Sequence, residues 1–358
     1  MKERIFITAL GATTAVGRTA WASAAAVRAG VSGFTEHSSL TDDAGQALRV
    51  AMAPWLDEQL YGIARFEALL FPAIDEALNA LPTSTPSTSR WAIALAQPSP
   101  RPGLPEDFSR QMLAHLSQRY GPVFGATAAF PAGHAAGLVA LQAACVKLRT
   151  GALDGCVVAG AESWLEPQTL KWLESCDQLH GAGPLNNAWG FIPGEAGAAL
   201  LLMRESVAHT HSLPLLAEVL GVGTAHEPKR NHTESVCIGE GLTQAFRAAL
   251  AALPAGQRVS NIYCDMNGEP YRADEFGFTA LRTKEHFDSV SDFNAPADCW
   301  GDVSAAGGLL HLILACAAAH KGYAKGPLTL AWASAEMGER AAALVATAAA
   351  GTAHSVGG

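Results

Sequence analysis

The stretch 130–141 has the residue types of an active-site turn, and it places a histidine, His134, where a helix is expected to begin. Small residues around it, among them Gly133 and Gly137, allow the backbone to approach a reacting group closely. A cysteine at this position would become a reactive thiolate. The positive end of the helix dipole would instead push a histidine toward its neutral form. The pattern therefore predicts a turn built to hold an active-site nucleophile, with a histidine at the position of that nucleophile.

Two more polar residues stand where chemistry could use them, and each also has a structural interpretation. Asp302 follows a glycine and precedes an apolar helical run, so it is expected either to act in a site or to cap that helix by accepting a backbone N–H. Asn267 precedes Gly268 in a turn pair where the asparagine itself could take a positive φ. His134 is expected to be either a catalytic group or a buried histidine bonded to a neighbouring carbonyl.

Other reactive side chains are predicted to have structural roles. Cys264 falls within an apolar run and is expected in the core, while Glu336 and Glu339 are expected in a solvated or interface loop. No group of histidine, cysteine and carboxylate residues has the spacing of a metal site, and no glycine run has the context of a phosphate-binding loop. We therefore expect no metal and no other cofactor.

Composition excludes several classes of function. The chain has 358 residues, 49% hydrophobic and 16% charged, which is enough for a large core. Its net charge of -9, without a basic stripe, argues against nucleic acid and against an anionic membrane surface as partners. Its seven cysteines form no CxxC pair and are typical of reduced thiols. The apolar run at Ile5 is too short for a signal peptide or a membrane span, so we expect a soluble, cytoplasmic protein.

Short apolar runs alternate with alanine-rich helical runs, which favours an α/β fold. Strands are predicted at 4–10, 91–96, 154–160, 196–203, 215–222, 261–266 and 327–333. Helices are predicted at 18–29, 59–81, 108–119, 135–150, 241–253, 303–321 and 341–350, with a loop at 82–89, a polar segment at 32–48 and a frayed end at 351–358. Because both parts of the chain repeat a strand, a glycine turn and a helix, we expect two related halves, 1–205 and 206–358.

Several of these blocks carry a resemblance. The strand and turn at 7–17 resemble the opening of the β-ketoacyl synthases, the condensing enzymes of fatty-acid and polyketide synthesis, and four further blocks agree in order. They lie at 137–141 with 155–162, at 190–198, at 261–269 and at 301–307. The resemblance implies a thiolase-like fold, with two duplicated halves in an α-β-α-β-α layered arrangement, usually as a dimer.

The departures from this family concern its chemical groups. The resemblance puts the family's nucleophile, four residues before Leu138, at His134, and its two catalytic histidines at Asn267 and Asp302. The family's lysine falls on Ala297. Closure of the two halves, as the family implies, would bring His134, Asn267 and Asp302 into one pocket, where a histidine beside a carboxylate is a plausible general-base pair.

The same resemblance suggests the substrate-binding residues. The family's late glycine-rich loop survives only around Met337 and Gly338, and Phe191 belongs to the block that closes the first half. Trp300, like Trp189, could fill the place of an acyl chain. We expect Met337, Gly338, Phe191 and Trp300 to form the substrate-binding part of the pocket.

Three functions follow as alternatives. The first is a non-condensing subunit that forms a homodimer, or a heterodimer with an active ketosynthase, and that binds acyl groups or acyl carrier protein. The second is an altered acyl-thioester enzyme that uses His134 and Asp302 as a base pair. The third is a non-metabolic adaptor that uses the fold as a binding scaffold.

Overall fold

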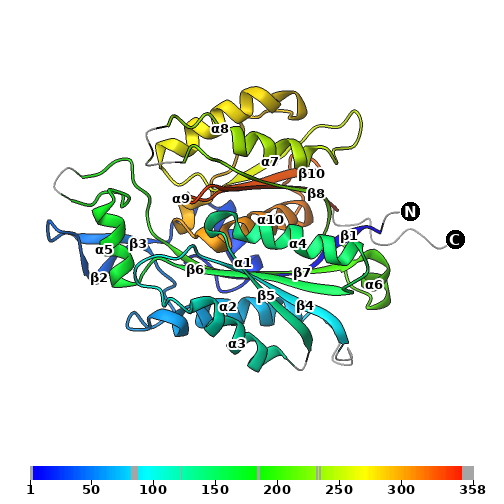
Figure 1. Cartoon of the computed structure of the whole chain (residues 1–358), viewed down its shortest axis with the longest axis horizontal. Helices are drawn as coiled ribbons and strands as arrows, with labels where there is room; N and C mark the ends of the chain where they lie inside the picture. Colours follow the sequence, from blue (N-terminus) through cyan, green and yellow to red (C-terminus); the bar gives the residue numbers. More distant parts are fainter. Residues whose placement is uncertain are drawn as a thin grey trace.

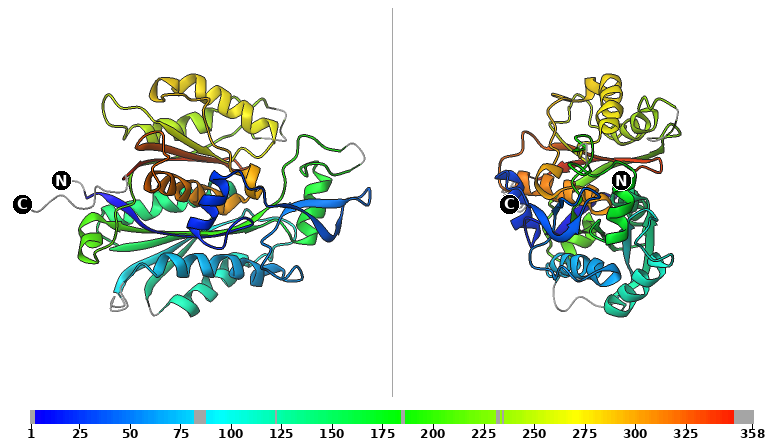
Figure 2. Two further views of the ribbon diagram at one scale, coloured as in Figure 1. Left: turned by 180° about the vertical axis from the view of Figure 1, so that it is seen from behind. Right: turned by 90° about the vertical axis from the view of Figure 1, so that its left-hand side faces the viewer.

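The structure is a computed structural model that describes residues 3–81, 88–121, 123–183, 186–230, 233 and 235–348. Most of the predicted loop at 82–89 and all of the predicted frayed end at 351–358 lie outside these residues. The layers of the molecule are visible in Figure 1 and, from behind and from the side, in Figure 2.

The main sheet has nine strands in the described chain, in the order β5-β4-β6-β7-β1-β8-β11-β10-β9. Its first five strands come from the N-terminal part: β5 (Phe124–Pro131), β4 (Thr88–Gln97), β6 (Gly155–Ser163), β7 (Glu195–Arg204) and β1 (Ile5–Thr14). The other four come from the C-terminal part: β8 (Ala217–His226), β11 (Glu339–Thr347), β10 (Leu328–Ser334) and β9 (Asn261–Cys264).

The strand pairings repeat about the centre of this sheet. β4 runs parallel to β6, and β9 runs parallel to β10. β7 pairs antiparallel with both β6 and β1, just as β11 pairs antiparallel with both β10 and β8. The two sets meet where Phe6 and Ile7 of β1 pair with Glu218 and Ala217 of β8. Because β7 ends at Arg204 and β8 begins at Ala217, we keep residue 205 as our proposed boundary between the halves.

Helices cover both sets of strands and fill the space between them (Figures 1 and 2). The middle layer contains α4 (Ala136–Arg149), α10 (Ser304–His320) and α1 (Ala20–Arg28). α2 (Gly62–Leu78) and α3 (Phe108–Tyr120) cover the outer face of the first set of strands, and α7 (Glu240–Leu250) and α8 (Pro270–Thr283) cover that of the second. The α-β-α-β-α arrangement and the thiolase-like fold are therefore confirmed.

The hairpin and short helices at one end of the molecule were not predicted. The segment described as polar, 32–48, forms most of the hairpin of β2 (Phe34–Thr41) and β3 (Ala47–Ala51), which packs against α5 (Pro167–Ser175). β5 and α8 were also missed. The remaining short elements are α6 (Glu205–Thr210), α9 (Ala297–Trp300) and the 3-10 turns Gly133–Ala135 and Lys284–His286.

The predicted helix at 341–350 is wrong, because most of this run is the strand β11. Ala341, Ala343 and Val345 pack against the middle helices, whereas Ala342 and Leu344 pack against α7 and α8. A strand covered on both faces has no polar positions, so it lacks the alternation that distinguishes a strand from a helix in sequence. Pairing with β8 and β10 overrides the high helix propensity of alanine.

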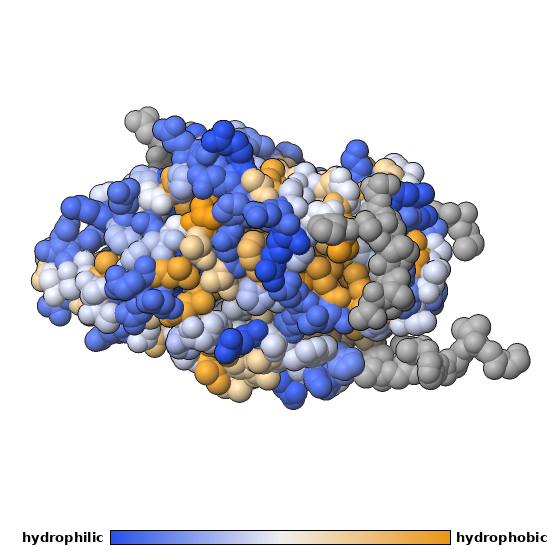
Figure 3. Space-filling model, turned by 90° about the horizontal axis from the view of Figure 1, so that it is seen from below, coloured by the Kyte–Doolittle hydropathy of each residue, from blue (hydrophilic) through white to orange (hydrophobic). Residues whose placement is uncertain are grey.

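No helix in the described part of the chain is long and apolar enough to span a bilayer. Seen from below, the surface is mixed, with small hydrophobic patches separated by hydrophilic residues (Figure 3).

Candidate functional site

His134 lies in the tight turn that joins β5 to α4. β5 ends at Pro131, and residues Gly133–Ala135 form a 3-10 turn directly before the helix. Gly133 has φ +52°, and a Cβ atom there would lie 2.7 Å from the Ser99 hydroxyl oxygen, so the turn needs a glycine. The strand and turn hold the His134 side chain in the interior, where the residue is 4% exposed.

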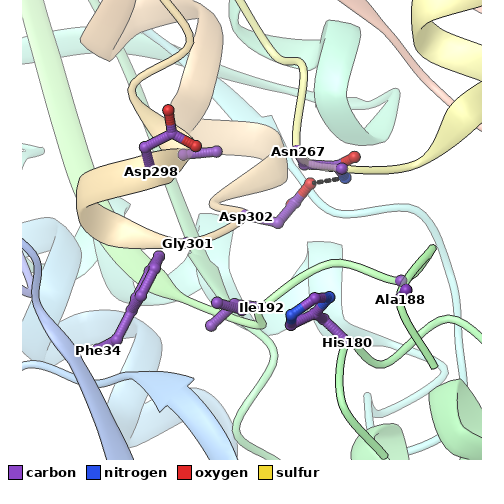
Figure 4. Close-up of a pocket in the computed structure, with 11 residues that line it drawn as sticks. Phe34, His180, Ala188, Ile192, Asn267, Asp298, Gly301 and Asp302 are labelled. Atoms are coloured by element: carbon purple, nitrogen blue, oxygen red, sulfur yellow. Dashed lines mark hydrogen bonds between the residues drawn. The ribbon is translucent and has the colours of Figure 1, made fainter. Parts of the chain in front are cut away.

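The structure brings His134, Asn267 and Asp302 together. His134 Nε2 lies 2.8 Å from Asp302 Oδ2, and the Asn267 amide donates to the same oxygen at 2.7 Å (Figure 4 shows the second bond). Asp302 Oδ1 accepts from the Trp164 indole N–H at 3.0 Å and from the Ser304 backbone N–H at 2.9 Å. Asp302 therefore accepts from the first backbone N–H of α10, as a capping side chain would, although the N-cap position itself is Val303, and it also belongs to the buried cluster.

The turn role expected of Asn267 belongs to its neighbour. Gly268 has φ +110°, and Asn267 is not among the positive-φ residues of the described chain. The Asn267 side chain instead accepts from the Glu269 backbone N–H at 3.1 Å and donates to Glu269 Oε2 at 3.0 Å. Since a glycine takes this conformation at little cost, the asparagine is free to serve the cluster.

Arg272 completes this cluster, and sequence reasoning missed it. Its guanidinium lies 3.1 Å from His134 Nε2, 2.8 Å from Asp265 Oδ2 and 3.1 Å from Glu269 Oε2. It also donates to the Ser334 carbonyl at 2.7 Å, and its side chain is 0% exposed. The available signal was Glu269-Pro270-Tyr271-Arg272, in which a proline opens a helix and opposite charges stand three residues apart.

The charges of this cluster shift the pKa of His134 upward, opposite to the direction expected from the helix start alone. Burial alone would lower the pKa of His134, but the charge and hydrogen bond of Asp302 outweigh it and raise the pKa above 6.5. Burial would raise the pKa of Asp302, yet His134 and Arg272 hold it well below its usual range. Burial also raises the pKa of Asp265, against the opposing charge of Arg272. Asp302 therefore favours the charged form of His134, and His134 with Arg272 favours the charged form of Asp302.

A cavity of about 220 Å³ opens beside this cluster, and Figure 4 shows its lining. Asn267 and Asp302 form part of its wall, with His180, Asp298 and the family-lysine position Ala297 nearby. Among the described residues that line it there is no cysteine, and His134 is not one of them. The cavity therefore meets the carboxylate and amide side of the cluster and has no thiol.

The four predicted substrate-binding residues are not among the described residues that line this cavity. Phe191 is buried against Trp164, with ring centroids 5.4 Å apart, and Trp300 is buried in the central core. Met337 is 53% exposed, and Gly338 packs against His226. Trp189, also considered as a filling side chain, is exposed. Sequence proximity to the glycine motifs did not place any of these side chains in the cavity.

Two other expectations concern the loop before β11. Cys264 is fully buried, as predicted. Glu336 is half-buried and accepts a hydrogen bond from Gln178, whereas Glu339 is the first residue of β11 rather than part of a solvated loop.

One group of side chains has the composition of a metal site. Glu227, Cys237 and Glu275 bring ligand atoms within 4.8 Å of one another. The Glu227 carboxylate accepts from the backbone N–H groups of Gly241 and Lys229, and Glu275 pairs with Arg340. These carboxylates therefore already have structural partners, and we assign no metal to them.

Known proteins share this architecture and part of this sequence. Residues 103–208, which include His134 and its turn, match the family described as Beta-ketoacyl synthase, N-terminal domain. No curated protein matches the chain. The solved structures that resemble it include a chain of AntDE:AntF, a type II PKS acyl-carrier protein in complex with its ketosynthase, at 15% identity with TM-score 0.80, covering 97% of this chain and 100% of that one.

Two further structures contain chain length factors. The ishigamide ketosynthase/chain length factor is 19% identical with TM-score 0.70, covering 96% of this chain and 99% of that one. The ketosynthase ApeO in complex with its chain length factor ApeC, from Xenorhabdus doucetiae, is 16% identical with TM-score 0.73, covering 97% and 98%. The resemblance predicted from the sequence is therefore confirmed: residues 103–208 match the β-ketoacyl synthase family, and the chain as a whole has the ketosynthase fold.

Proposed function

We propose that this chain is a non-condensing β-ketoacyl-synthase-like protein, a pseudoenzyme that works by associating with an active ketosynthase or an acyl carrier protein in the cytoplasm. The observation that carries the proposal is the buried cluster of His134, Asp302, Asn267 and Arg272 beside a cavity without a thiol. The cluster stands where the resemblance puts the family's catalytic groups, and its polar atoms bind one another.

Condensation needs chemistry that this cluster does not supply. A thiolate must carry the acyl group, and donors must hold the thioester oxygen while the malonyl group loses carbon dioxide. An acyl group on His134 would hydrolyse readily. The Asp302 carboxylate would repel both the malonyl carboxylate and the developing enolate, and loss of one oxyanion donor alone costs roughly a hundred-fold in rate.

The geometry does not favour the second alternative, an acyl-thioester enzyme that uses His134 and Asp302 as a base pair. A general base needs a free lone pair near the proton that it removes. His134 Nε2 is directed at Asp302, the ring lies behind the cavity wall, and the pKa of His134 is raised above 6.5. The Nε2 nitrogen is therefore engaged by Asp302, and His134 is not among the described residues that line the cavity where a substrate would present its proton.

Association has support from the outer strand of the sheet. β5 is an edge strand of eight residues, and its sequence FGATAAFP carries no charge. Gly125, Ala126 and Ala128 are exposed along it. Folded proteins usually protect such an edge with charges, bulges or a covering segment, because a bare edge can pair with a strand of another chain. Some of the similar solved structures are complexes of a ketosynthase with a chain length factor or an acyl-carrier protein, which suggests partners of these classes.

Two measurements test the proposal. Incubation of the purified protein with acyl and malonyl thioesters, followed by intact mass determination, is expected to show no adduct. Native mass spectrometry should show a dimer, alone or with a co-expressed ketosynthase, that Ala128→Lys in β5 abolishes. Ala251→Lys, at the exposed end of α7, is the matched control and should leave the dimer intact. A stable acyl adduct would overturn the non-condensing role, and a monomer under all these conditions would overturn the subunit role.

A further inference from the structure

A second hollow lies between α1 and the C-terminal end of α10, outside the buried cluster. Its volume is about 330 Å³, within the range of pockets that take small ligands. Alanines of both helices form its floor, among them Ala25 of α1 and Ala317 of α10, while Trp21 and Tyr323 form aromatic walls. We call it the α1–α10 pocket. Its apolar floor suits the body of an organic molecule rather than a bare ion.

The cationic side chains of Arg28 and Lys321 lie over the faces of these aromatic rings. The Arg28 guanidinium carbon lies 4.0 Å from the centre of the Tyr323 ring, and Lys321 Nζ lies 5.4 Å from the centre of the Trp21 ring. The His320 ring packs against Trp21 in a tilted arrangement, with ring centroids 4.9 Å apart. No carboxylate is among the described residues that line the pocket, and neither cation has an ion-pair partner in the described chain. In a protein with a net charge of -9, this pocket has the opposite local charge.

Stabilisation of the helix ends does not by itself explain why Arg28 and Lys321 lie at this pocket. Arg28 is the last residue of α1 and Lys321 follows the last residue of α10, where cations favour the negative end of the helix dipole. Carbonyls in the last turn of each helix already accept from backbone N–H groups, since Val31 N–H donates to Ala26 and Tyr323 N–H donates to Ala318. The charged groups therefore remain available to a ligand.

From this geometry we infer that the α1–α10 pocket binds a small organic anion with a flat apolar body, such as an aromatic carboxylate, sulfonate or phosphate ester. The body lies on the alanine floor between the Trp21 and Tyr323 rings, and the anionic group accepts from Arg28 and Lys321. Hydrogen bonds between ionised partners are about twice as strong as neutral ones, so the cations set both affinity and charge preference. This inference does not depend on the proposed function.

Anilinonaphthalene sulfonate, a flat aromatic anion, is a suitable probe for titration of the full chain by fluorescence. Arg28→Gln and Lys321→Gln each remove one charge and keep the stem, and each should weaken binding about tenfold. Ala25→Leu fills the floor from an exposed helix position and should abolish binding with an unchanged melting temperature. Uncharged phenylnaphthylamine should bind the wild type more weakly than the sulfonate and should not respond to the charge variants.

Arg18 offers a matched control, because it stands 5.6 Å over the Trp55 ring and belongs to no part of the α1–α10 pocket. Arg18→Gln should leave the dissociation constant unchanged. The inference fails if the sulfonate does not bind, if Arg18→Gln weakens binding as much as the pocket variants, or if the uncharged probe binds equally well. Each of these results leaves the proposed association of the chain untouched, since that is measured by mass.

Discussion

The buried polar residues at the centre of this protein bond mainly to one another, and Asp302 is their common acceptor. Asp302 accepts from four groups: the His134 ring, the Asn267 amide, the Trp164 indole and the Ser304 backbone. A buried charge pair adds little net stability compared with an apolar pair, but removal of one partner leaves the other charge uncompensated. Such a cluster is what we expect of the non-condensing role proposed above.

Removal of the Asp302 charge should destabilise the protein because it leaves the charges of its partners uncompensated. Asp302→Asn should lower the free energy of unfolding by about 3–5 kcal/mol, because His134 and Arg272 lose a buried counter-charge. Asp298→Asn is the control, since Asp298 lines the same cavity, is exposed and forms no ion pair in the described chain. The control should change stability by at most about 0.5 kcal/mol. Equal effects of the two substitutions in urea unfolding would contradict the assigned charge pair.

The second prediction follows from the raised pKa of His134. The unfolded histidine titrates near 6.5, and the folded one titrates at higher pH. Its contribution is therefore fully present below pH 6.5 and is lost as the pH rises through the folded value. The difference in unfolding free energy between the wild type and His134→Gln should shrink as the pH is raised above that window. A difference that grows with pH would mean that His134 is neutral and accepts from Arg272.

At this scale the sequence predicted the meeting of His134, Asn267 and Asp302 but not the rest of the cluster. The three were found because the family motifs fix their positions in the turn, the loop and the helix start. Arg272 comes from α8, a helix that was not predicted, and its contact with His134 joins residues 138 positions apart. Long-range contacts of this kind depend on how helices pack, and local periodicity does not encode them.

At the scale of elements, α4 and α10 fit closely against each other in the middle layer. A Cβ atom on Gly137 would lie 2.9 Å from Leu309 Cγ, and one on Gly308 would lie 2.8 Å from Leu138 Cγ. Each helix thus offers a glycine to a leucine of the other, which lets the two backbones approach closely. The positions of these glycines thus indicate where two helices pack closely. An alanine run is less informative, because β11 shows that such a run alone does not distinguish a buried strand from a helix.

The third prediction uses two adjacent glycines of α10. Gly308→Ala should destabilise the protein by about 1–3 kcal/mol, because the new methyl group overlaps the buried Leu138 side chain. The neighbouring Gly307 has space, with its nearest contact at 3.9 Å, so Gly307→Ala should stabilise the helix by roughly 0.5–1 kcal/mol. Thermal unfolding of the two variants should therefore shift in opposite directions. Shifts of the same sign would show that helix propensity, not the fit to α4, governs this face.

At the scale of the whole molecule, the two halves share one interior. The central core contains residues of β1 and α4 together with residues of α10 and β11, and β1 pairs directly with β8. α10 is buried along Ser304–Ala319, without a polar face. A helix that is apolar all round must be covered on every side, and here the cover comes from both halves. We therefore expect the repeat seen in the sequence to describe topology and not two units that fold separately.

The last prediction tests this interdependence. The fragment 206–358, expressed alone, would expose the face of α10 that packs on α4 and the edge of β8 that meets β1, so it should be insoluble or lack cooperative unfolding. Co-expression with the fragment 1–205 should restore a soluble complex, because the two share the core and the His134–Asp302 pair. Circular dichroism and tryptophan fluorescence should then report one coincident urea transition, as for the intact chain. A fragment 206–358 that unfolds cooperatively by itself would mean that the halves are independent domains, with the buried cluster formed only when they dock.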